Sequence, residues 1–157
     1  MKKIHFILAL ITTSFSFAQS SLKEDVAIIQ SIFGKEKKEL VNQYMAVATD
    51  KSDEFWKIYD EFETERKTLG QTKINIVNEY VVNYTTLTNE KADELVKATL
   101  KNNMDYEKLN EKYYAKIKKS IGALEAAKFI QLEGFIQNSI KNTLLSSIPF
   151  IGEIDRK

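Results

Sequence analysis

The chain has 157 residues, no cysteine, one histidine, one proline and a formal net charge of +1. Without cysteine there is no disulfide framework and no thiolate nucleophile, and a near-neutral charge is a poor match to nucleic-acid binding. The only histidine, His5, lies in a segment that we expect to be removed, so the mature chain lacks an imidazole base and the usual ligands for zinc, copper or nickel. We therefore predict a protein that is not an enzyme and has no cofactor. Its carboxylates leave open the weak binding of a hard cation.

The first 18 residues have the pattern of a cleavable export leader. Residues 1–3 give a positive start, residues 4–11 form a short apolar run, and Ser-Phe-Ala at 16–18 is a small-residue cleavage pattern. The apolar run is shorter than the roughly 20 residues that span a bilayer, and no cysteine follows it for lipid attachment. We predict cleavage after about Ala18, which leaves a periplasmic protein of 139 residues without stable membrane insertion.

Residues 19–157 have the pattern of a single all-α domain. The only proline is Pro149, glycines are sparse, and apolar residues recur at steps of three and four. A first helix is predicted over about 21–47, beginning with a capping box. Its narrow apolar stripe includes Leu40 and Tyr44, and a stripe this narrow is typical of a coiled-coil edge.

A second helix is predicted from Thr49, its N-cap, to about Tyr84. One face of this helix carries three aromatic residues, Phe55, Tyr59 and Phe62. Such a face forms a core or a dimer seam more often than a surface for binding other proteins, and all three uses remain open. Trp56, at the margin of the face, is the residue that we expect to be partly exposed and available for binding.

A third helix is predicted to begin after Thr88 as its N-cap and to run to about Ile117. Its apolar positions include Leu95, Leu100, Leu109 and Tyr113. After a turn at 120–122, a fourth helix is predicted to end before Pro149, leaving a short apolar tail from about residue 147. Short links predict antiparallel neighbours. An elongated array of helical hairpins has a thin core and leaves apolar stripes uncovered, so we expect a homodimer.

Two similar segments follow the threonines at the predicted helix starts. Residues 51–57 read KSDEFWK, and residues 91–97 read KADELVK. With its lead-in Leu-Thr-Asn-Glu-Lys at 87–91, the second segment resembles the Leu-Thr-x-x-Gln motif, which occurs twice in the Spy/CpxP family of bacterial periplasmic proteins. Lys91 stands where the motif has glutamine, and the earlier copy, at 48–52, keeps only the threonine.

This resemblance implies an all-helical hairpin fold, a curved and cradle-like dimer, and motif positions at two helix starts. The motif positions carried over to this chain are Thr49, Leu87, Thr88 and Lys91. A threonine at a helix start is also an ordinary N-cap, which contributes about 1 kcal/mol. The motif and the plain cap therefore remain alternative explanations of both threonines.

A second resemblance covers most of the mature chain. Its segments are Phe55-Trp56-x-x-Tyr59-Asp60, Glu65-Arg66, Ala127-Lys128-Phe129-x-Gln131-x-Glu133 and Ile148-Pro149. They resemble a recurrent arrangement in uncharacterised bacterial envelope proteins related to the same family. The arrangement implies a fold and a compartment, and no chemistry is attached to it.

Charge is unevenly distributed along the chain. Seven acidic residues and two lysines lie between Asp50 and Glu65, whereas seven lysines and four acidic residues lie between Lys101 and Lys128. We favour neutralisation between adjacent helices or across a dimer. The alternative is an amphipathic surface that attracts acidic, partly unfolded chains. Its residues would be Lys112, Tyr113, Tyr114, Lys116 and Ile117.

The combined pattern predicts an exported protein-binding protein of Spy/CpxP-like type, acting as a chaperone or envelope-stress modulator. It would work without ATP, because the chain has no glycine-rich phosphate-binding loop. Its partners would be a second copy of itself and non-native or envelope proteins. One alternative is an adaptor or inhibitor that docks onto an envelope sensor protein. Another is a metal-responsive periplasmic protein, against which the lack of mature-chain histidine and cysteine counts heavily.

Overall fold

The structure is a computed structural model that describes residues 36–152. The predicted leader, the start of the first helix and the end of the tail lie outside the described residues. The chain divides into two units between Lys37 and Lys38, and the packing discussed below is that of the second unit. The described residues form helices and no strand, so the predicted all-α fold is confirmed.

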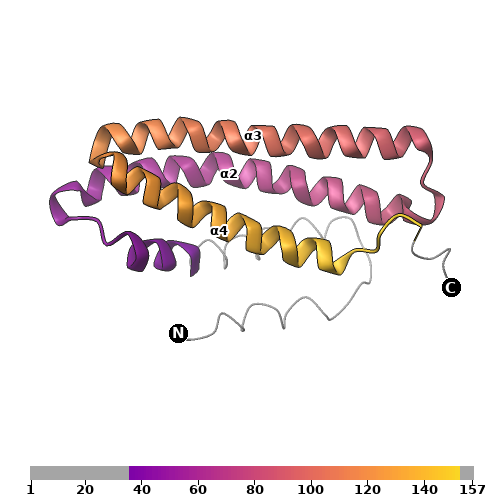
Figure 1. The fold of residues 1–157 in the computed structure, drawn as a ribbon, viewed down its shortest axis with the longest axis horizontal. Helices are drawn as coiled ribbons and strands as arrows, with labels where there is room; N and C mark the ends of the chain where they lie inside the picture. Colours follow the sequence, from indigo (N-terminus) through magenta and orange to yellow (C-terminus); the bar gives the residue numbers. More distant parts are fainter. Residues whose placement is uncertain (1–35, 153–157) are drawn as a thin grey trace. The chain divides into compact units, whose positions relative to one another are not determined.

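Three long helices make up most of this unit, and consecutive helices run antiparallel (Figure 1). They are α2 (Thr49–Asn83), α3 (Asn89–Ile121) and α4 (Ala123–Ser147). Residues 36–45 are also helical, and a short 3₁₀ helix, η2 (Tyr84–Thr86), follows α2. The links are as short as predicted, and a single residue, Gly122, separates α3 from α4. No helix within the described part of the chain has an apolar stretch sufficient to span a bilayer.

The helix ends confirm one predicted cap and correct another. Thr88 is the N-cap of α3, and its hydroxyl accepts a hydrogen bond of 3.2 Å from the amide of Lys91. The N-cap of α2, however, is Ala48, so the prediction for Thr49 is wrong by one residue. The physical reason is the tight link before it, where Ala46 adopts a left-handed φ of 44° and reverses the chain within three residues. Thr49 thus becomes the first residue of the helix rather than its cap.

The third helix ends one turn later than predicted. It runs to Ile121 because Ile117 and Ile121 both point into the core. Gly122 then has φ 107° and ψ 161°, a backbone conformation essentially reserved for glycine. This residue ends α3 and turns the chain into α4.

The aromatic face of α2 forms the core. Phe129 of α4 is fully buried, and its ring lies edge-on to three aromatic rings of α2. The centroids are 6.1 Å from Phe55, 6.3 Å from Tyr59 and 5.2 Å from Phe62. Tyr113 of α3 completes the cluster with a centroid 5.3 Å from that of Phe62. Edge-to-face packing of this kind is the favoured arrangement of aromatic side chains.

The predicted stripe of the first helix is wrong over its described part. Val41 and Met45 are buried, whereas Leu40 and Tyr44 are 37% and 43% exposed. Val41 and Met45 are four residues apart, and so are Leu40 and Tyr44, so spacing alone does not show which pair is buried. Contacts from α4 show it. The Lys128 ammonium donates a hydrogen bond of 3.0 Å to the carbonyl of Met45 and lies 5.7 Å from the ring centre of Tyr44. Tyr44 therefore lies at the edge of the core, and Met45 lies within it.

Burial is concentrated in the first half of α2 and of α4, whereas the buried residues of α3 extend from Leu95 to Ile121. The buried residues of α2 all lie between Phe55 and Arg66. Those of α4 lie between Ala126 and Ile136, among the residues whose side chains are described. The later apolar positions of α2, such as Val77, are only partly covered. The well-packed half therefore fixes the fold, and the other half presents more of its apolar side chains to solvent.

Candidate protein-binding surface

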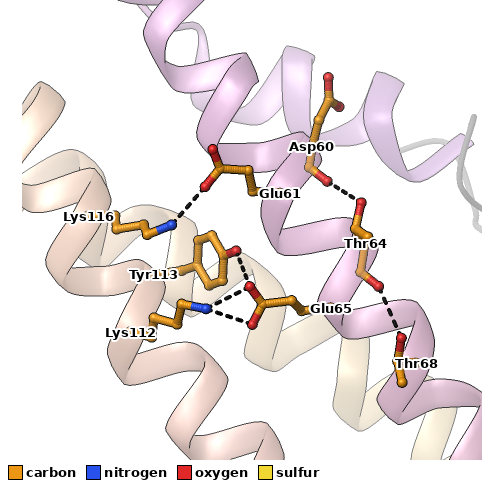
Figure 2. Close-up of polar contacts among 8 residues, drawn as sticks. All are labelled: Asp60, Glu61, Thr64, Glu65, Thr68, Lys112, Tyr113 and Lys116. Atoms are coloured by element: carbon orange, nitrogen blue, oxygen red, sulfur yellow. Dashed lines mark hydrogen bonds and ion pairs between the residues drawn. The ribbon is translucent and has the colours of Figure 1, made fainter.

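The lysine-rich stretch of α3 is paired with the acidic stretch of α2 (Figure 2). The Lys112 ammonium lies 2.6 and 2.8 Å from the two carboxylate oxygens of Glu65, and the Lys116 ammonium lies 2.7 Å from Glu61. The Tyr113 hydroxyl also donates to Glu65, at 2.8 Å. For these residues, the favoured expectation of neutralisation between adjacent helices describes the structure.

These contacts shift the titration of the groups involved. Hydrogen bonds from Lys112 and Tyr113 hold the pKa of Glu65 below its usual range. A hydrogen bond from Lys116 does the same for the pKa of Glu61. The pKa of Tyr113 is raised, first by burial and then by its hydrogen bond to Glu65. The side chains of both ion pairs are nearly half exposed to water, so each pair adds little stability.

The structure divides the predicted basic and aromatic surface between core and rim. Tyr113 and Ile117 are fully buried, and Tyr114 is partly exposed. Lys112 and Lys116 reach the solvent but are paired with α2 as described. Because its apolar members lie in the core, this stretch offers no continuous apolar surface to a partner of the folded unit.

The aromatic candidates on α2 are divided in the same way. Phe55, Tyr59 and Phe62 are each at most 1% exposed, so they are core residues. Trp56 is partly exposed at the rim, as expected. Its indole packs edge-on against Tyr59 at 5.3 Å, and the Lys38 ammonium lies 5.1 Å from its centre. Trp56 is therefore already engaged by the protein's own side chains.

The family-motif positions make structural contacts at the junction of α2 and α3. Leu87 lies in the extended link, and Thr88 caps α3. The Lys91 ammonium lies 3.0 Å from Glu79 of α2 and 3.1 Å from Glu94, and these hydrogen bonds raise the pKa of Lys91. Lys91 thus ties the first turn of α3 to the end of α2.

A buried polar cluster, which the sequence patterns did not reveal, lies on the inner side of α2. Arg66 and Glu63 are 6% and 7% exposed and form a two-pronged pair, with Nε–Oε1 at 2.8 Å and Nη2–Oε2 at 3.0 Å. Glu133 of α4 is fully buried nearby. Burial alone would lower the pKa of Arg66, but the hydrogen bond and charge of Glu63, with the charge of Glu133, raise it.

Residues of α3 adjoin this cluster. The burial of Tyr106 raises its pKa, while the charge of Arg66 partly opposes that effect. The amide of Asn102 donates a hydrogen bond of 3.0 Å to the carbonyl of Leu69. Arg66 and Glu133 both belong to the segments of the second resemblance, which was the only sequence signal for the cluster. Among residues 36–152, no group of three or more carboxylates, histidines or cysteines could hold a metal ion.

An apolar stripe is exposed on the outer face of α3. Val96 is 54% exposed, and Leu100 and Met104 are each 56% exposed. A spacing of four places the three side chains along one side of the helix. Two ion pairs on the same helix border the stripe, namely Lys97–Asp93 at 2.5 Å and Lys101–Asp105 at 2.6 Å. We call these three residues the α3 stripe.

The apolar positions predicted for the third helix do not all lie on one face. Leu95 is 8% exposed and faces the core, whereas Leu100 faces solvent. Five residues at 100° per residue separate the two side chains by about 140°, so they cannot share a face. The spacing of four between the apolar residues 96, 100 and 104 is the sequence pattern that indicates the α3 stripe.

Comparison of the chain with models of known protein families, with curated proteins and with solved structures gives no match. The proposals below therefore depend on the residues and geometry of this chain.

Proposed function

We propose that this protein is an exported, non-enzymatic protein-binding protein that acts as a chaperone or envelope-stress modulator without ATP. In this proposal it binds non-native or envelope proteins through the α3 stripe. The supporting observation is that Val96, Leu100 and Met104 lie more than half exposed in a row. Most residues that the sequence predicted for this role are buried in the core, and the α3 stripe is exposed instead.

The chemistry of the stripe fits weak and reversible capture. Fully burying a large aliphatic side chain yields about 1.5–3 kcal/mol, so covering the exposed half of each of the three contributes about 1 kcal/mol. The sum, about 3 kcal/mol, is reduced further by the cost of association. Met104 adds a flexible side chain that adapts to partners of different shape. A surface of this strength holds an unfolded segment briefly and releases it.

The test is suppression of aggregation by the leader-free protein. A variant carrying Val96→Ser, Leu100→Gln and Met104→Gln is expected to lose most of the effect on a heated or chemically reduced client. The matched control is Leu124→Gln, because Leu124 is 79% exposed outside the stripe. Circular dichroism verifies that both variants keep the fold. If the wild-type protein at several-fold excess leaves aggregation unchanged, the chaperone role must be abandoned.

A specific adaptor is the second candidate, and the ordered border of the stripe favours it. Lys97 and Lys101 are held by carboxylates on their own helix, which gives the apolar row a defined, narrow edge. Such an edge suits the packing of one partner helix, including α3 of a second copy. Affinity capture from envelope extracts separates the two candidates. One stoichiometric partner supports the adaptor, and a broad population supports the chaperone. Sedimentation of the leader-free protein tests the homodimer.

A further inference from the structure

Two tyrosines near the end of α2 hold the segment that follows α4. The Tyr80 hydroxyl donates a hydrogen bond of 2.7 Å to the carbonyl of Pro149, and the Tyr84 hydroxyl donates one of 2.7 Å to the carbonyl of Phe150. The tyrosines lie one helical turn apart, with ring centroids 5.6 Å from each other and an interplanar angle of 70°. The two hydroxyls therefore donate hydrogen bonds to the carbonyls of two successive residues in a neighbouring segment.

The segment is extended because of its own sequence. Ile148 has φ −116° and ψ 143°, since a residue before proline disfavours the helical conformation. The two hydrogen bonds from the tyrosines go to main-chain carbonyls. Phe150 is 79% exposed and Ile151 is 65% exposed. Hydrogen bonds to main-chain carbonyls require an extended backbone and can be made to segments of different sequence.

From this geometry we propose that Tyr80 and Tyr84 form a binding site for extended apolar polypeptide segments, which the chain's own tail occupies as a tethered competitor. Val81, which follows Tyr80 in sequence, is 40% exposed and adds apolar surface beside the tyrosines at this end of α2. The inference deepens the proposed function, because an extended apolar segment is what a non-native protein offers. It concerns a different surface from the α3 stripe.

The tether explains why the site is filled in the folded chain. A covalently linked segment acts at an effective concentration on the order of millimolar, so a free peptide must compete with it. A substitution that weakens the binding of the tail to the two tyrosines should therefore strengthen the binding of a free peptide. Pro149→Gly is the suitable change, because it keeps every carbonyl while removing the constraint that holds the segment extended.

The experiment measures fluorescence anisotropy of two end-capped peptides with the full-length leader-free protein. One peptide has the sequence of residues 148–152, Ile-Pro-Phe-Ile-Gly, and the other is Val-Pro-Leu-Val-Gly. Pro149→Gly should bind both peptides several-fold more tightly than wild type does. Adding Tyr80→Phe and Tyr84→Phe to that variant should weaken binding about tenfold, since two hydroxyl hydrogen bonds are lost. Tyr44→Phe, which changes a tyrosine of the first helix, is the matched control.

Three results would overturn the proposal. These are no peptide binding to Pro149→Gly, unchanged binding after loss of both hydroxyls, and binding of the chain's own sequence only. The last result would make the tyrosines a latch for the tail alone. Thermal melting identifies any variant that fails to fold, and the single Tyr84→Phe change then replaces the double one. Loss of aggregation suppression with peptide binding intact would count against the proposed chaperone role and leave this site standing.

Discussion

Alkaline pH should unfold this protein through two tyrosines of its interior. Tyr59 and Tyr106 are 1% and 8% exposed and adjoin the cluster of Glu63, Arg66 and Glu133. Burial raises the pKa of Tyr59 far above that of a free tyrosine, and the charges of Glu63 and Glu133 raise it further. Burial also raises the pKa of Tyr106, against the opposing charge of Arg66. Both side chains thus stay neutral in the folded protein at a pH where a free tyrosine ionises.

The sign and size of the effect follow from linkage. A group whose pKa is raised by folding stabilises the folded state fully below its unfolded pKa, which is about 10 for tyrosine. That stabilisation is lost as the pH rises toward the folded pKa. At pH 11 an unfolded tyrosine with a pKa of about 10 gains about 1.4 kcal/mol by ionising. Tyr59 supplies nearly all of that amount, and Tyr106 adds at most as much again, so the two give about 1.5–3 kcal/mol. Domains of this size are stable by only about 5–15 kcal/mol in total.

The measurement is urea unfolding at pH 8 and pH 11, followed by circular dichroism. The wild type should lose about 1.5–3 kcal/mol more between these pH values than the variant Tyr59→Phe/Tyr106→Phe. Deprotonation of lysines weakens both proteins alike and cancels in this difference. Tyrosinate absorbance at 295 nm shows when the phenols ionise. Equal losses for the two proteins, or ionisation of all tyrosines near pH 10 with native circular dichroism, would refute the reasoning.

Other substitutions test single features of the backbone and core by urea unfolding. Gly122→Ala should destabilise by about 1–3 kcal/mol through its backbone conformation alone, because an added Cβ would meet no atom within 4 Å. Gly134→Ala, inside α4 and equally free of contacts, should stabilise by about 0.5–1 kcal/mol; effects of the same sign would contradict this pair. Ala46→Gly should stabilise by up to about 1 kcal/mol by relieving the left-handed φ of 44°, and a loss would disprove that conformation. Phe129→Ala should cost about 3–5 kcal/mol, and a cost below 1 kcal/mol would argue against its place in the core.

The helices were predictable from the sequence because their signals are local. Spacings of three and four, one proline and few glycines specify helix without reference to any other segment. The two threonine starts show the limit of such signals. Thr88 follows an extended link and caps α3, whereas Thr49 follows the turn at Ala46 and lies one residue inside α2. Which residue becomes the cap depends on how the preceding chain turns, and a single-sequence pattern does not contain that geometry.

The charge pairing between α2 and α3 could be predicted only in part. Glu61 and Glu65 are four residues apart on α2, and their partners Lys116 and Lys112 are four residues apart on α3 in the reverse order. This is the order that two antiparallel helices require. An antiparallel hairpin therefore brings them together once its register is known. The link contains a short 3₁₀ turn, η2, which local sequence patterns do not predict, so the register is known only from the assembled hairpin. The sequence therefore predicts that the charges of adjacent helices neutralise each other, but it does not predict which lysine pairs with which glutamate.

The buried charges were missed for a tertiary reason. Glu63 and Arg66 lie on the same arc of α2 as the aromatic face, but charged residues in a lysine-rich helical chain are exposed by default. Their partner in the buried cluster, Glu133, belongs to α4 and lies about 70 residues away in sequence. Contacts from α4 also decided the aromatic face, because Phe129 turns Phe62 and its neighbours into core. The sequence showed which side chains share a face, and only the assembled helices show what covers it.

The uneven burial separates the parts of the protein that keep it folded from the parts proposed to bind. The buried positions of α2 end at Arg66, while Tyr80 lies near the end of α2 and Tyr84 begins η2. The α3 stripe lies in the first half of α3. Regions with few buried contacts open at a lower free-energy cost than a packed core does. Binding at that end can therefore rearrange side chains, or release the tail, without disturbing the aromatic cluster. A protein that must hold different partners weakly benefits from this division, since the adaptable surface is not needed to maintain the fold.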